Sequence, residues 1–501
     1  MSTVVVAIDA GTTGVRAIAM NEAGRPVGAS YQEFTQFFPQ PGWVEHDALE
    51  IWNTVATVTR DLVAHHLPAD ATVAAIGITN QRETVLAWDL ATGIPHAKAI
   101  VWPDRRTANR CDDLTADGFL PTVRATTGLV LDPYFSASKI EWLLSEGGVP
   151  AHPNLAIGTI DDWLVWNLTG GIRGGVHVTD PSNASRTMLY DLRTHAWSPE
   201  LCDTFGVPMA SLGEMRPSAG RLGTVHADAL GGVLAGVPVS GVLGDQQAAL
   251  FGQACVHPGM AKNTYGTGSF VLLNVGPELP ATSEGLLTTV AWDLGAHGPF
   301  TYALEGSVFV TGAAIQWLRD GLQIISSASE VGPLAASVNS TDGVYFVPAF
   351  TGLGSPHWDP YARGTIVGLT RGIGRAHIAR AVVESMAFQV RDVVDAMTRA
   401  SGKALKELRV DGGASVMDLL LQLQADQLGV NVCRPVVTEC SALGAAFAAG
   451  LAEGVWSSVG EVESSWAEEA QFPPTIGRLT ADAAHHTWTR AVDRSRGWVT
   501  A

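Results

Sequence analysis

Residues 4–14 read Val-Val-Val-Ala-Ile-Asp-Ala-Gly-Thr-Thr-Gly, and the predicted fold is organised around this stretch. Its β-branched residues favour a buried strand that ends before Asp9. The two glycines let the chain turn where a side chain would obstruct a phosphate. Asp9 can hold a metal ion, while the hydroxyls of Thr12 and Thr13 and the backbone N–H groups of the turn can donate to phosphate oxygens. By itself, such a turn is also common in hairpins.

The pattern recurs in the second half of the chain, and this repetition favours a phosphate loop over a hairpin. Val239–Leu243 reads as a strand that leads into Gly244-Asp245, and Asn263–Ser269 repeats the Gly/Thr turn. The alternation of strands and helices predicts α/β domains. A chain of 501 residues exceeds what one core usually fills, so we expect two related domains, 1–250 and 251–501, that face one nucleotide across a cleft.

Composition excludes several classes of function. The net charge of -18 argues against nucleic acid and against an anionic membrane surface. The longest nearly apolar stretch, Ala442–Ala452, is too short to span a bilayer. Five cysteines without a Cys-x-x-Cys pair suit free thiols in a reducing cytoplasm, and the N-terminus lacks an export signal.

Other catalytic motifs are missing from the sequence. It contains no Gly-x-x-x-x-Gly-Lys-Ser/Thr loop, no dinucleotide fingerprint and no His-Glu-x-x-His helix. We interpret the pairs His65-His66 and His485-His486 as solvated helix residues rather than metal ligands. These patterns give no support to P-loop chemistry, hydride transfer or zinc proteolysis.

Polar residues follow two predicted strands. Val73–Thr79 delivers Asn80-Gln81-Arg82-Glu83 at its carboxyl end, where ligands bind in open α/β sheets. A short strand over Ala99–Trp102 is followed by further charged residues. A helix after the cap Asp47, a helix from Gln246 and a long amphipathic helix over 378–397 are also predicted. We expect the stretch 152–221 to be an insertion on the first domain.

Longer motifs carry a resemblance to a known family. They are Pro41–Asp47, Gly77–Thr84, Asp132–Ser136, Asn183–Leu189, Gly244–Gly252, Ala261–Gly268, Pro348–Gly354 and Val410–Gly413. With these motifs the chain resembles, over nearly its whole length, the glycerol kinases of the carbohydrate-kinase family. That family shares the actin and hexokinase ATPase fold, so the resemblance implies two actin-like, ribonuclease H-like ATPase domains with a cleft between them.

The resemblance implies transfer of the γ-phosphate of ATP to glycerol, which gives sn-glycerol 3-phosphate and ADP, the first step of glycerol catabolism. The residues implied to contact glycerol are Arg82, Glu83, Trp102, Tyr134, Asp245, Gln246 and Phe270. Asp245 is the implied general base, because a carboxylate can orient a primary alcohol and accept its proton. A strand-end Asp that caps the following helix is the alternative.

On the nucleotide side, the resemblance implies the contacts Thr12, Thr13, Arg16, Thr267, Gly312, Gln316 and Gly413. It implies Mg²⁺ near Asp9 and Asp245, where the ion would bridge the phosphates. Arg16 could equally be a surface charge. Relatives are dimers or tetramers, so we expect a homodimer or homotetramer. From the composition we expect a cytoplasmic protein without nucleic-acid partners or membrane insertion.

The sequence departs from the family in three places. Met417 stands where many relatives have a nucleotide-contacting Asn, so that contact is not carried over. The loop Leu230–Gly236 lacks the Arg of relatives inhibited by fructose 1,6-bisphosphate, which predicts weak or no inhibition. Trp102 is followed by Pro103-Asp104 in place of the usual pair. Two alternatives stay open: a sister kinase for a pentitol, ketopentose or aldonate, and a non-catalytic actin-like filament protein or nucleotide-switched regulator.

Overall fold

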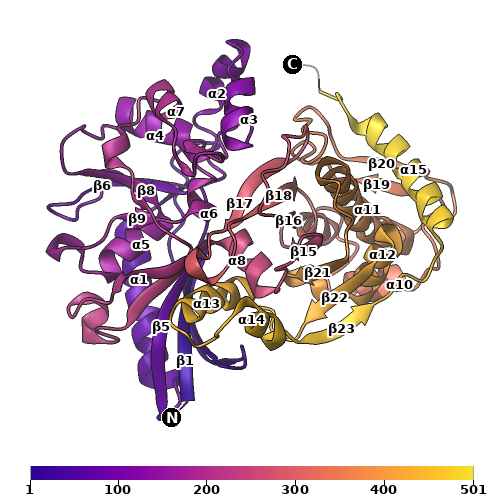
Figure 1. Cartoon of the computed structure of the whole chain (residues 1–501). Coiled ribbons are helices and arrows are strands. Elements are labelled where there is room, and N and C mark those ends of the chain that lie inside the picture. Colours follow the sequence, from indigo (N-terminus) through magenta and orange to yellow (C-terminus); the bar gives the residue numbers. More distant parts are fainter. Residues whose placement is uncertain (1, 500–501) are drawn as a thin grey trace.

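The strand predicted from residues 4–8 lies inside a six-stranded sheet. A computed structural model describes residues 2–499 and shows two lobes, each built on one large sheet (Figure 1). The order in the N-terminal sheet is β13 (Ala219–Thr224), β14 (Pro238–Gly244), β5 (Ala71–Asn80), β1 (Ser2–Ala10), β2 (Gly14–Asn21) and β3 (Pro26–Glu33). The strands β1, β2 and β3 form an antiparallel meander, while β5 runs parallel to β1 and β14 runs parallel to β5.

The C-terminal sheet repeats this arrangement. Its seven strands are ordered β17 (Leu287–Trp292), β18 (Thr301–Val308), β16 (Ser269–Gly276), β15 (Met260–Tyr265), β21 (Glu407–Asp411), β22 (Asn431–Pro435) and β23 (Glu468–Phe472). As with β1, strand β15 pairs antiparallel with its successor across a Gly/Thr turn and parallel with a strand on its other side. The predicted relation between the two halves is therefore confirmed at the level of topology.

Helix α1 (Ala48–Asp61) covers the N-terminal sheet as its sequence predicts. The Asp47 carboxylate caps it by accepting hydrogen bonds from the N–H groups of Leu49 and Glu50. Ile51 and Val55 are fully buried in one core with the β1 side chains. Beside this core lies a four-stranded sheet, in the order β4 (Glu45–His46), β7 (Ala99–Ile100), β6 (Val85–Asp89) and β8 (Leu155–Thr159), with helices α2 (Ala108–Ala116), α3 (Leu120–Thr127) and α4 (Ser136–Ser145) nearby in the chain.

The expectation that 152–221 is an insertion was wrong. Helix α5 (Ile160–Leu168) buries Trp163 in the same core as β1 and α1, where the indole N–H donates to the Ala48 carbonyl at 2.9 Å. The other elements of this stretch are β9 (Val178–Thr179), α6 (Pro181–Ala184), β10 (Tyr190–Asp191), β11 (Ala196–Trp197), α7 (Pro199–Thr204) and β12 (Glu214–Met215). Such short elements carry too few turns for a hydrophobic period to be visible, although Val178, Tyr190 and Leu201 are buried.

The amphipathic helix predicted over 378–397 is confirmed in the C-terminal lobe. The long helix is α11 (Arg375–Ser401), which ends at Gly402 with φ 65°, and α12 (Asp418–Leu428) ends at Gly429 with φ 74°. A left-handed residue directly after a helix is the usual position for glycine. The remaining elements are α9 (Gly312–Gln316), α10 (Val331–Ala336), β19 (Tyr345–Val347), β20 (Thr365–Val367), α14 (Val459–Ser465) and α15 (Arg478–Ser495).

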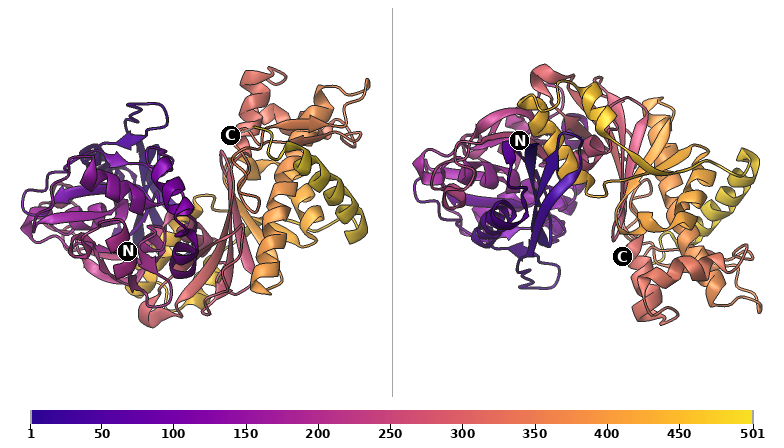
Figure 2. Two further views of the ribbon diagram at one scale, coloured as in Figure 1. Left: turned by 90° about the horizontal axis from the view of Figure 1, so that it is seen from above. Right: turned by 90° about the horizontal axis from the view of Figure 1, so that it is seen from below.

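Helix α13 (Cys440–Ala452) returns to the N-terminal sheet. It packs on β5, β14 and α8 (Asp245–Gly252), at the base of the two lobes (Figures 1 and 2). The approach is so close that a Cβ on Gly77 would lie 2.1 Å from the Ala445 carbonyl oxygen, and a Cβ on Gly444 would meet the Ala248 carbonyl. Glycines are therefore required at this contact. Among residues 2–499, no helix is both long enough and apolar enough to cross a membrane.

Candidate active site

Arg82 and Glu83 lie just beyond the carboxyl end of β5, as predicted, and both side chains are buried. Strand β14 runs parallel to β5 and ends at the same edge, so Asp245, the first residue of α8, comes next to them. The Arg82 Nε lies 3.1 Å from Asp245 Oδ1. Glu83 has φ 59°, a conformation that side-chain-bearing residues rarely adopt, and strain of this kind gathers at functional sites. The topology thus brings three predicted substrate residues together.

Two residues without a predicted role complete this charged cluster. Glu305, on β18 of the C-terminal lobe, accepts from Arg82 Nη1 and Nη2 at 2.6 and 3.0 Å and from Arg186 Nη2 at 3.2 Å. Arg186 Nε also donates to Glu83 Oε1 at 2.7 Å. All four side chains are at most 3% exposed. The sequence signal that could have revealed Glu305 is its position as a lone charged residue in the strand Thr301–Val308, because a buried charge needs a partner.

The two buried glutamates, Glu305 and Glu83, differ in how far their charges are compensated by hydrogen bonds and arginines. Burial raises the pKa of Glu305, but Arg186 and Arg82 outweigh it and hold that pKa at about 2. The Glu83 side chain accepts a hydrogen bond from Arg186, and burial raises its pKa despite the neighbouring arginines. A buried carboxylate with unused lone pairs has room for hydroxyl donors from a ligand.

Aromatic residues connect this cluster to the phosphate loop. Arg82 Nη2 donates to the Tyr134 hydroxyl at 3.3 Å, and the Tyr134 and Trp102 rings meet edge to face at 5.6 Å. The Trp102 indole N–H donates to Thr12 Oγ1 at 3.0 Å. The buried Lys139 Nζ donates to the carbonyls of Trp102 and Tyr134 at 3.3 and 2.9 Å, which fixes the backbone of both residues.

The remaining predicted substrate residues lie on the far side of Asp245. The Gln246 side-chain oxygen accepts a short hydrogen bond from Lys262 Nζ, on β15. Burial lowers the Lys262 pKa to about 8, although Asp411 and Asp245 oppose this. Phe270, on β16, is half-buried and packs against the core around α8. Its role in covering the substrate stays a prediction.

Asp9 and the phosphate loop lie at the same edge of the sheet. The pKa of Asp9 is raised to about 7, first by burial and then by the nearby charge of Asp245. A pair of neighbouring carboxylates is a donor set suited to a hard cation such as Mg²⁺. Arg16 pairs with Asp9 across the β1–β2 hairpin, and its guanidinium lies 3.6 Å from Glu439 Oε1. Thr13 is exposed in the turn.

The second Gly/Thr turn, within Asn263–Ser269, is hydrogen-bonded to the segment that carries the predicted adenosine residue Gly312. Gly312 N–H donates to the Gly266 carbonyl at 3.0 Å, and a Cβ on Gly312 would lie only 2.6 Å from that oxygen. The N–H of Thr311 donates to the carbonyl of Thr267 at 2.9 Å. The predicted residues Thr267, Gln316 and Gly413 are all exposed. The exposed polar groups are thus available to a nucleotide.

The three places where the sequence departs from the family each have a defined environment in the structure. Met417 precedes α12 and lies against Gly332 of α10. Asp104, the second residue of the variant Pro-Asp pair, is buried and accepts a hydrogen bond from the Val44 N–H at 2.7 Å. It thereby holds the segment that contains Val44. In the Leu230–Gly236 loop, the space beside Gly231 is filled by the Arg60 side chain of α1.

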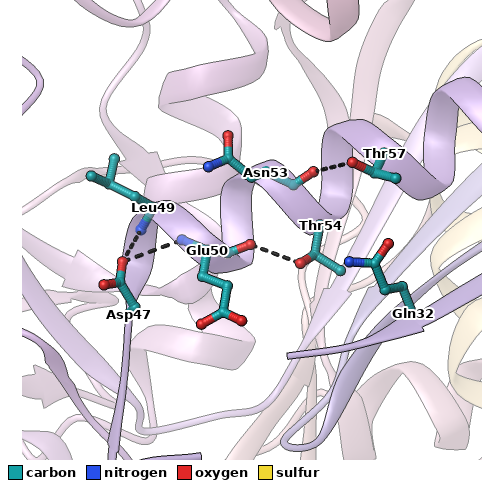
Figure 3. A pocket seen from close by; sticks show the side chains of 7 residues that line it. All are labelled: Gln32, Asp47, Leu49, Glu50, Asn53, Thr54 and Thr57. Carbon is teal, nitrogen blue, oxygen red and sulfur yellow. Dashed lines mark hydrogen bonds between the residues drawn. The ribbon is translucent and has the colours of Figure 1, made fainter. Parts of the chain in front are cut away.

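A separate open pocket of about 360 Å³ lies along the start of α1 (Figure 3). Its lining residues are Gln32, Asp47, Leu49, Glu50, Asn53, Thr54 and Thr57. None of the predicted substrate or nucleotide residues lines it, and several of its polar side chains are occupied in capping and stabilising the helix.

Both halves of the chain match one family in sequence. The N-terminal domain of the FGGY family of carbohydrate kinases matches residues 4–252, and the C-terminal domain of that family matches residues 261–453. The chain belongs to the FGGY family of carbohydrate kinases. The resemblance seen in the sequence motifs is therefore confirmed, as is the α/β fold of two actin-like ATPase domains.

Individual similar proteins and solved structures agree with this family assignment. The chain is 52% identical over 500 residues to a glycerol kinase of Rhodopirellula baltica, covering 99% of this chain and 91% of that protein. It is 52% identical over 501 residues to a glycerol kinase of Halorhodospira halophila, covering 99% and 97%. The crystal structure of Plasmodium falciparum glycerol kinase with ADP superimposes with a TM-score of 0.92 at 33% identity, covering 99% and 98%. A gluconate kinase structure from Lactobacillus acidophilus, at 20% identity and a TM-score of 0.87, shares the fold.

Proposed function

We propose that this FGGY kinase transfers the γ-phosphate of ATP to a terminal hydroxyl of glycerol, which gives sn-glycerol 3-phosphate and ADP. The observation that carries the proposal is the meeting of Arg82, Glu83 and Asp245 at one sheet edge, in a chain 52% identical over its length to glycerol kinases. A family of kinases implies ATP as the phosphoryl donor.

The three hydroxyl groups of glycerol require both donors and acceptors from the site. Arg82 supplies donors, Glu83 supplies acceptor lone pairs, and the Tyr134 hydroxyl can do both. Because Glu305 and Arg186 hold these side chains in fixed positions, the site is built before the substrate arrives. A site that pairs every hydroxyl rejects analogues that lack one. Trp102, Gln246 and Phe270 remain proposed substrate contacts at the border of the site.

Asp245 acts as the general base in this proposal. Arg82 orients its carboxylate through Oδ1, and the Gln246 N–H donates to the same oxygen at 2.7 Å. The other oxygen, Oδ2, is then available to accept the proton of the attacking hydroxyl as the oxygen–phosphorus bond forms. The side chain is 30% exposed, so a substrate can reach it.

For the nucleotide, we propose that the loop residues Thr12 and Thr13 and the opposite Thr267 contact the phosphates, with Arg16 beside them. Gly312, Gln316 and Gly413 are proposed to line the adenosine pocket. Mg²⁺ held by Asp9 and Asp245 would neutralise phosphate charge when bound. The division into domains 1–250 and 251–501, and a homodimer or homotetramer, also remain proposals.

The test of the base is Asp245→Asn. General bases contribute about 10²–10⁴-fold, so kcat is expected to fall by at least about 100-fold in an ADP-release assay with saturating glycerol and MgATP. Asp47→Asn is the matched control, because Asp47 also stands at a helix start, outside the site, and Asn caps equally well. A kcat within threefold of wild type in Asp245→Asn would leave Asp245 only a helix-capping role.

Substrate choice is tested with the same assay at equal concentrations of glycerol, xylitol, erythritol, D-xylulose and D-gluconate, with a control that lacks substrate. A large excess of ADP release with glycerol is expected. Greater ADP release with another substrate would support a kinase but change the proposed substrate. No ADP release above the control with any of them would overturn the proposed activity.

A further inference from the structure

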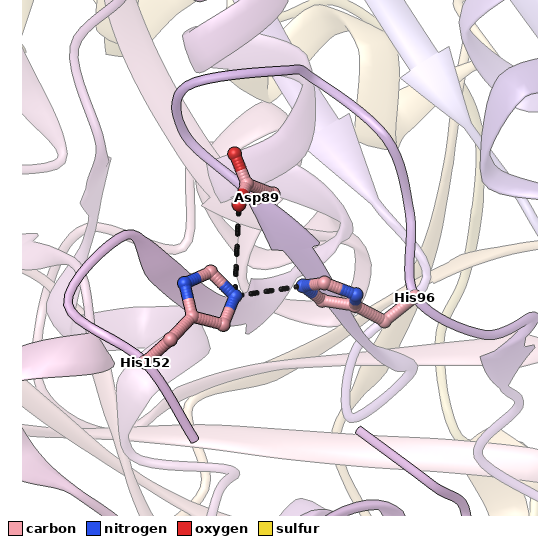
Figure 4. A group of neighbouring side chains, drawn as sticks. All are labelled: Asp89, His96 and His152. Atoms are coloured by element: carbon pink, nitrogen blue, oxygen red, sulfur yellow. Dashed lines mark hydrogen bonds and ion pairs between the residues drawn. The ribbon is translucent and has the colours of Figure 1, made fainter. Parts of the chain in front are cut away.

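Asp89, His96 and His152 form a cluster away from the active site, at the edge of the four-stranded sheet (Figure 4). His152 Nε2 lies 3.2 Å from His96 Nε2 and 3.6 Å from Asp89 Oδ2. One atom from each residue falls within 4.8 Å of the other two. Among residues 2–499, this is the only group of three or more His, Cys, Asp or Glu side chains that meets this distance.

The spacing of these atoms suits a tetrahedral metal ion. With metal–ligand bonds of about 2.0–2.1 Å, tetrahedral ligands lie about 3.3 Å from one another. The two separations from His152 Nε2 bracket this value, and the third pair of atoms lies within 4.8 Å. Imidazole nitrogens favour zinc and its neighbours in the first transition row, while Mg²⁺ and Ca²⁺ favour oxygen alone.

The backbone holds all three residues in place before any ion binds. The Asp89 N–H donates to the Ile94 carbonyl at 3.1 Å and the His96 N–H donates to the Ala87 carbonyl at 2.9 Å, which closes the turn after β6. Strand β8, which follows His152 directly in the chain, pairs with β6, and its Leu155 lies opposite Asp89. Such prior ordering lowers the entropic cost of binding a ligand.

Hydrogen bonds also direct the carboxylate. Asp89 Oδ1 accepts from the N–H groups of Ala91 and Thr92 at 2.7 and 2.8 Å, so Oδ2 is the oxygen turned towards His152. Outer hydrogen bonds of this kind orient metal ligands and are conserved features of metal sites.

We propose that Asp89, His96 and His152 bind one transition-metal ion of the zinc type, with the fourth position open to water. The ion would bind the lone pair of His152 Nε2. This places the ring hydrogen on Nδ1 and gives up the long 3.3 Å contact from the Asn154 N–H. The ion would tie the turn after β6 to the loop before β8.

This role is structural and separate from phosphoryl transfer. Strand β6 (Val85–Asp89) lies between Glu83 and Asp89, and its four steps alone, at about 3.3 Å per residue, span about 13 Å. Kinase activity in MgATP is therefore expected to be unchanged in variants of the cluster, and retained activity shows that each variant is folded.

The test is titration of the chelator-treated protein with ZnCl₂ alone, followed by calorimetry, and with CoCl₂ alone, followed by the visible absorption of tetrahedral Co²⁺. One equivalent is expected to bind to wild type, and His96→Gln and His152→Gln are each expected to weaken binding at least about tenfold. Asp89→Asn is the conservative variant, since Asn can keep the hydrogen bonds from Ala91 and Thr92 while losing the charge, and it should also weaken binding.

The double variant His65→Gln/His66→Gln is the matched control. These histidines also lie beside an aspartate, but each binds a different oxygen of Asp61, so their nitrogens do not converge. The control is expected to bind zinc like wild type. The proposal is overturned if wild type binds no more tightly than His96→Gln, or if the control loses binding to the same extent.

Discussion

Replacing Glu305 by Gln removes the carboxylate that joins the two lobes. Glu305 comes from β18 and receives three hydrogen bonds from Arg82 and Arg186, which lie in the other lobe. After the change, two buried guanidinium groups share Glu83 as their only fully buried carboxylate partner in the cluster, and the partly exposed Asp245 cannot reach both. An uncompensated buried positive charge results.

The expected loss of stability is large. Breaking one side of a buried ion pair costs about 3–5 kcal/mol. The Glu305 pKa gives a similar figure, because its fall from 4.5 to about 2 corresponds to roughly 3 kcal/mol at pH 7. The pKa is lowered in the folded state, so this stabilisation is complete above about pH 4.5 and is lost as the pH falls through about 2.

The assay is urea unfolding followed by tryptophan fluorescence at pH 7, combined with glycerol kinetics. Glu305→Gln should lower the free energy of unfolding by about 3 kcal/mol and raise KM for glycerol at least about tenfold, because Arg82 loses its anchor. Glu407→Gln is the control: Glu407 also lies on a strand and pairs with Arg409, but it is partly exposed, so its loss should cost no more than about 1 kcal/mol. A free energy of unfolding for Glu305→Gln that is within about 1 kcal/mol of wild type would refute the reasoning.

Three further outcomes follow from the structure. Asp9 ionises only as the pH rises through about 7, so the apparent affinity for Mg²⁺ in the kinase assay should be about tenfold lower at pH 6 than at pH 8. An apparent Mg²⁺ affinity that does not change with pH would contradict this. Gly77→Ala places a Cβ against the Ala445 carbonyl and should lower the melting temperature by several degrees, whereas Gly477→Ala, which meets no neighbour, should leave it within about two degrees. Fructose 1,6-bisphosphate at millimolar concentration should inhibit weakly or not at all, because the Leu230–Gly236 loop has no cation of its own; strong inhibition in the ADP-release assay would show that another cation serves instead.

Local patterns in the sequence predicted much of the fold. The β-branched run of β1, the cap at Asp47 and the amphipathic period of α11 each depend on neighbouring residues, and the structure confirms them. The same holds for Arg82 and Glu83, because a strand followed by polar residues places them at the ligand edge of an open sheet. Their roles toward glycerol stay predictions, as do those of the nucleotide residues.

What only the tertiary structure decided is which distant residues meet. The sequence by itself determined two related α/β halves and the Gly/Thr turn after β1, since strand and turn preferences act over a few residues. It did not reveal that Glu305 reaches Arg82 across 223 positions, that α13 packs on the N-terminal sheet, or that His96 and His152 adjoin Asp89. These contacts follow from how the two sheets and their connections pack in three dimensions, and a local period carries no information about that packing.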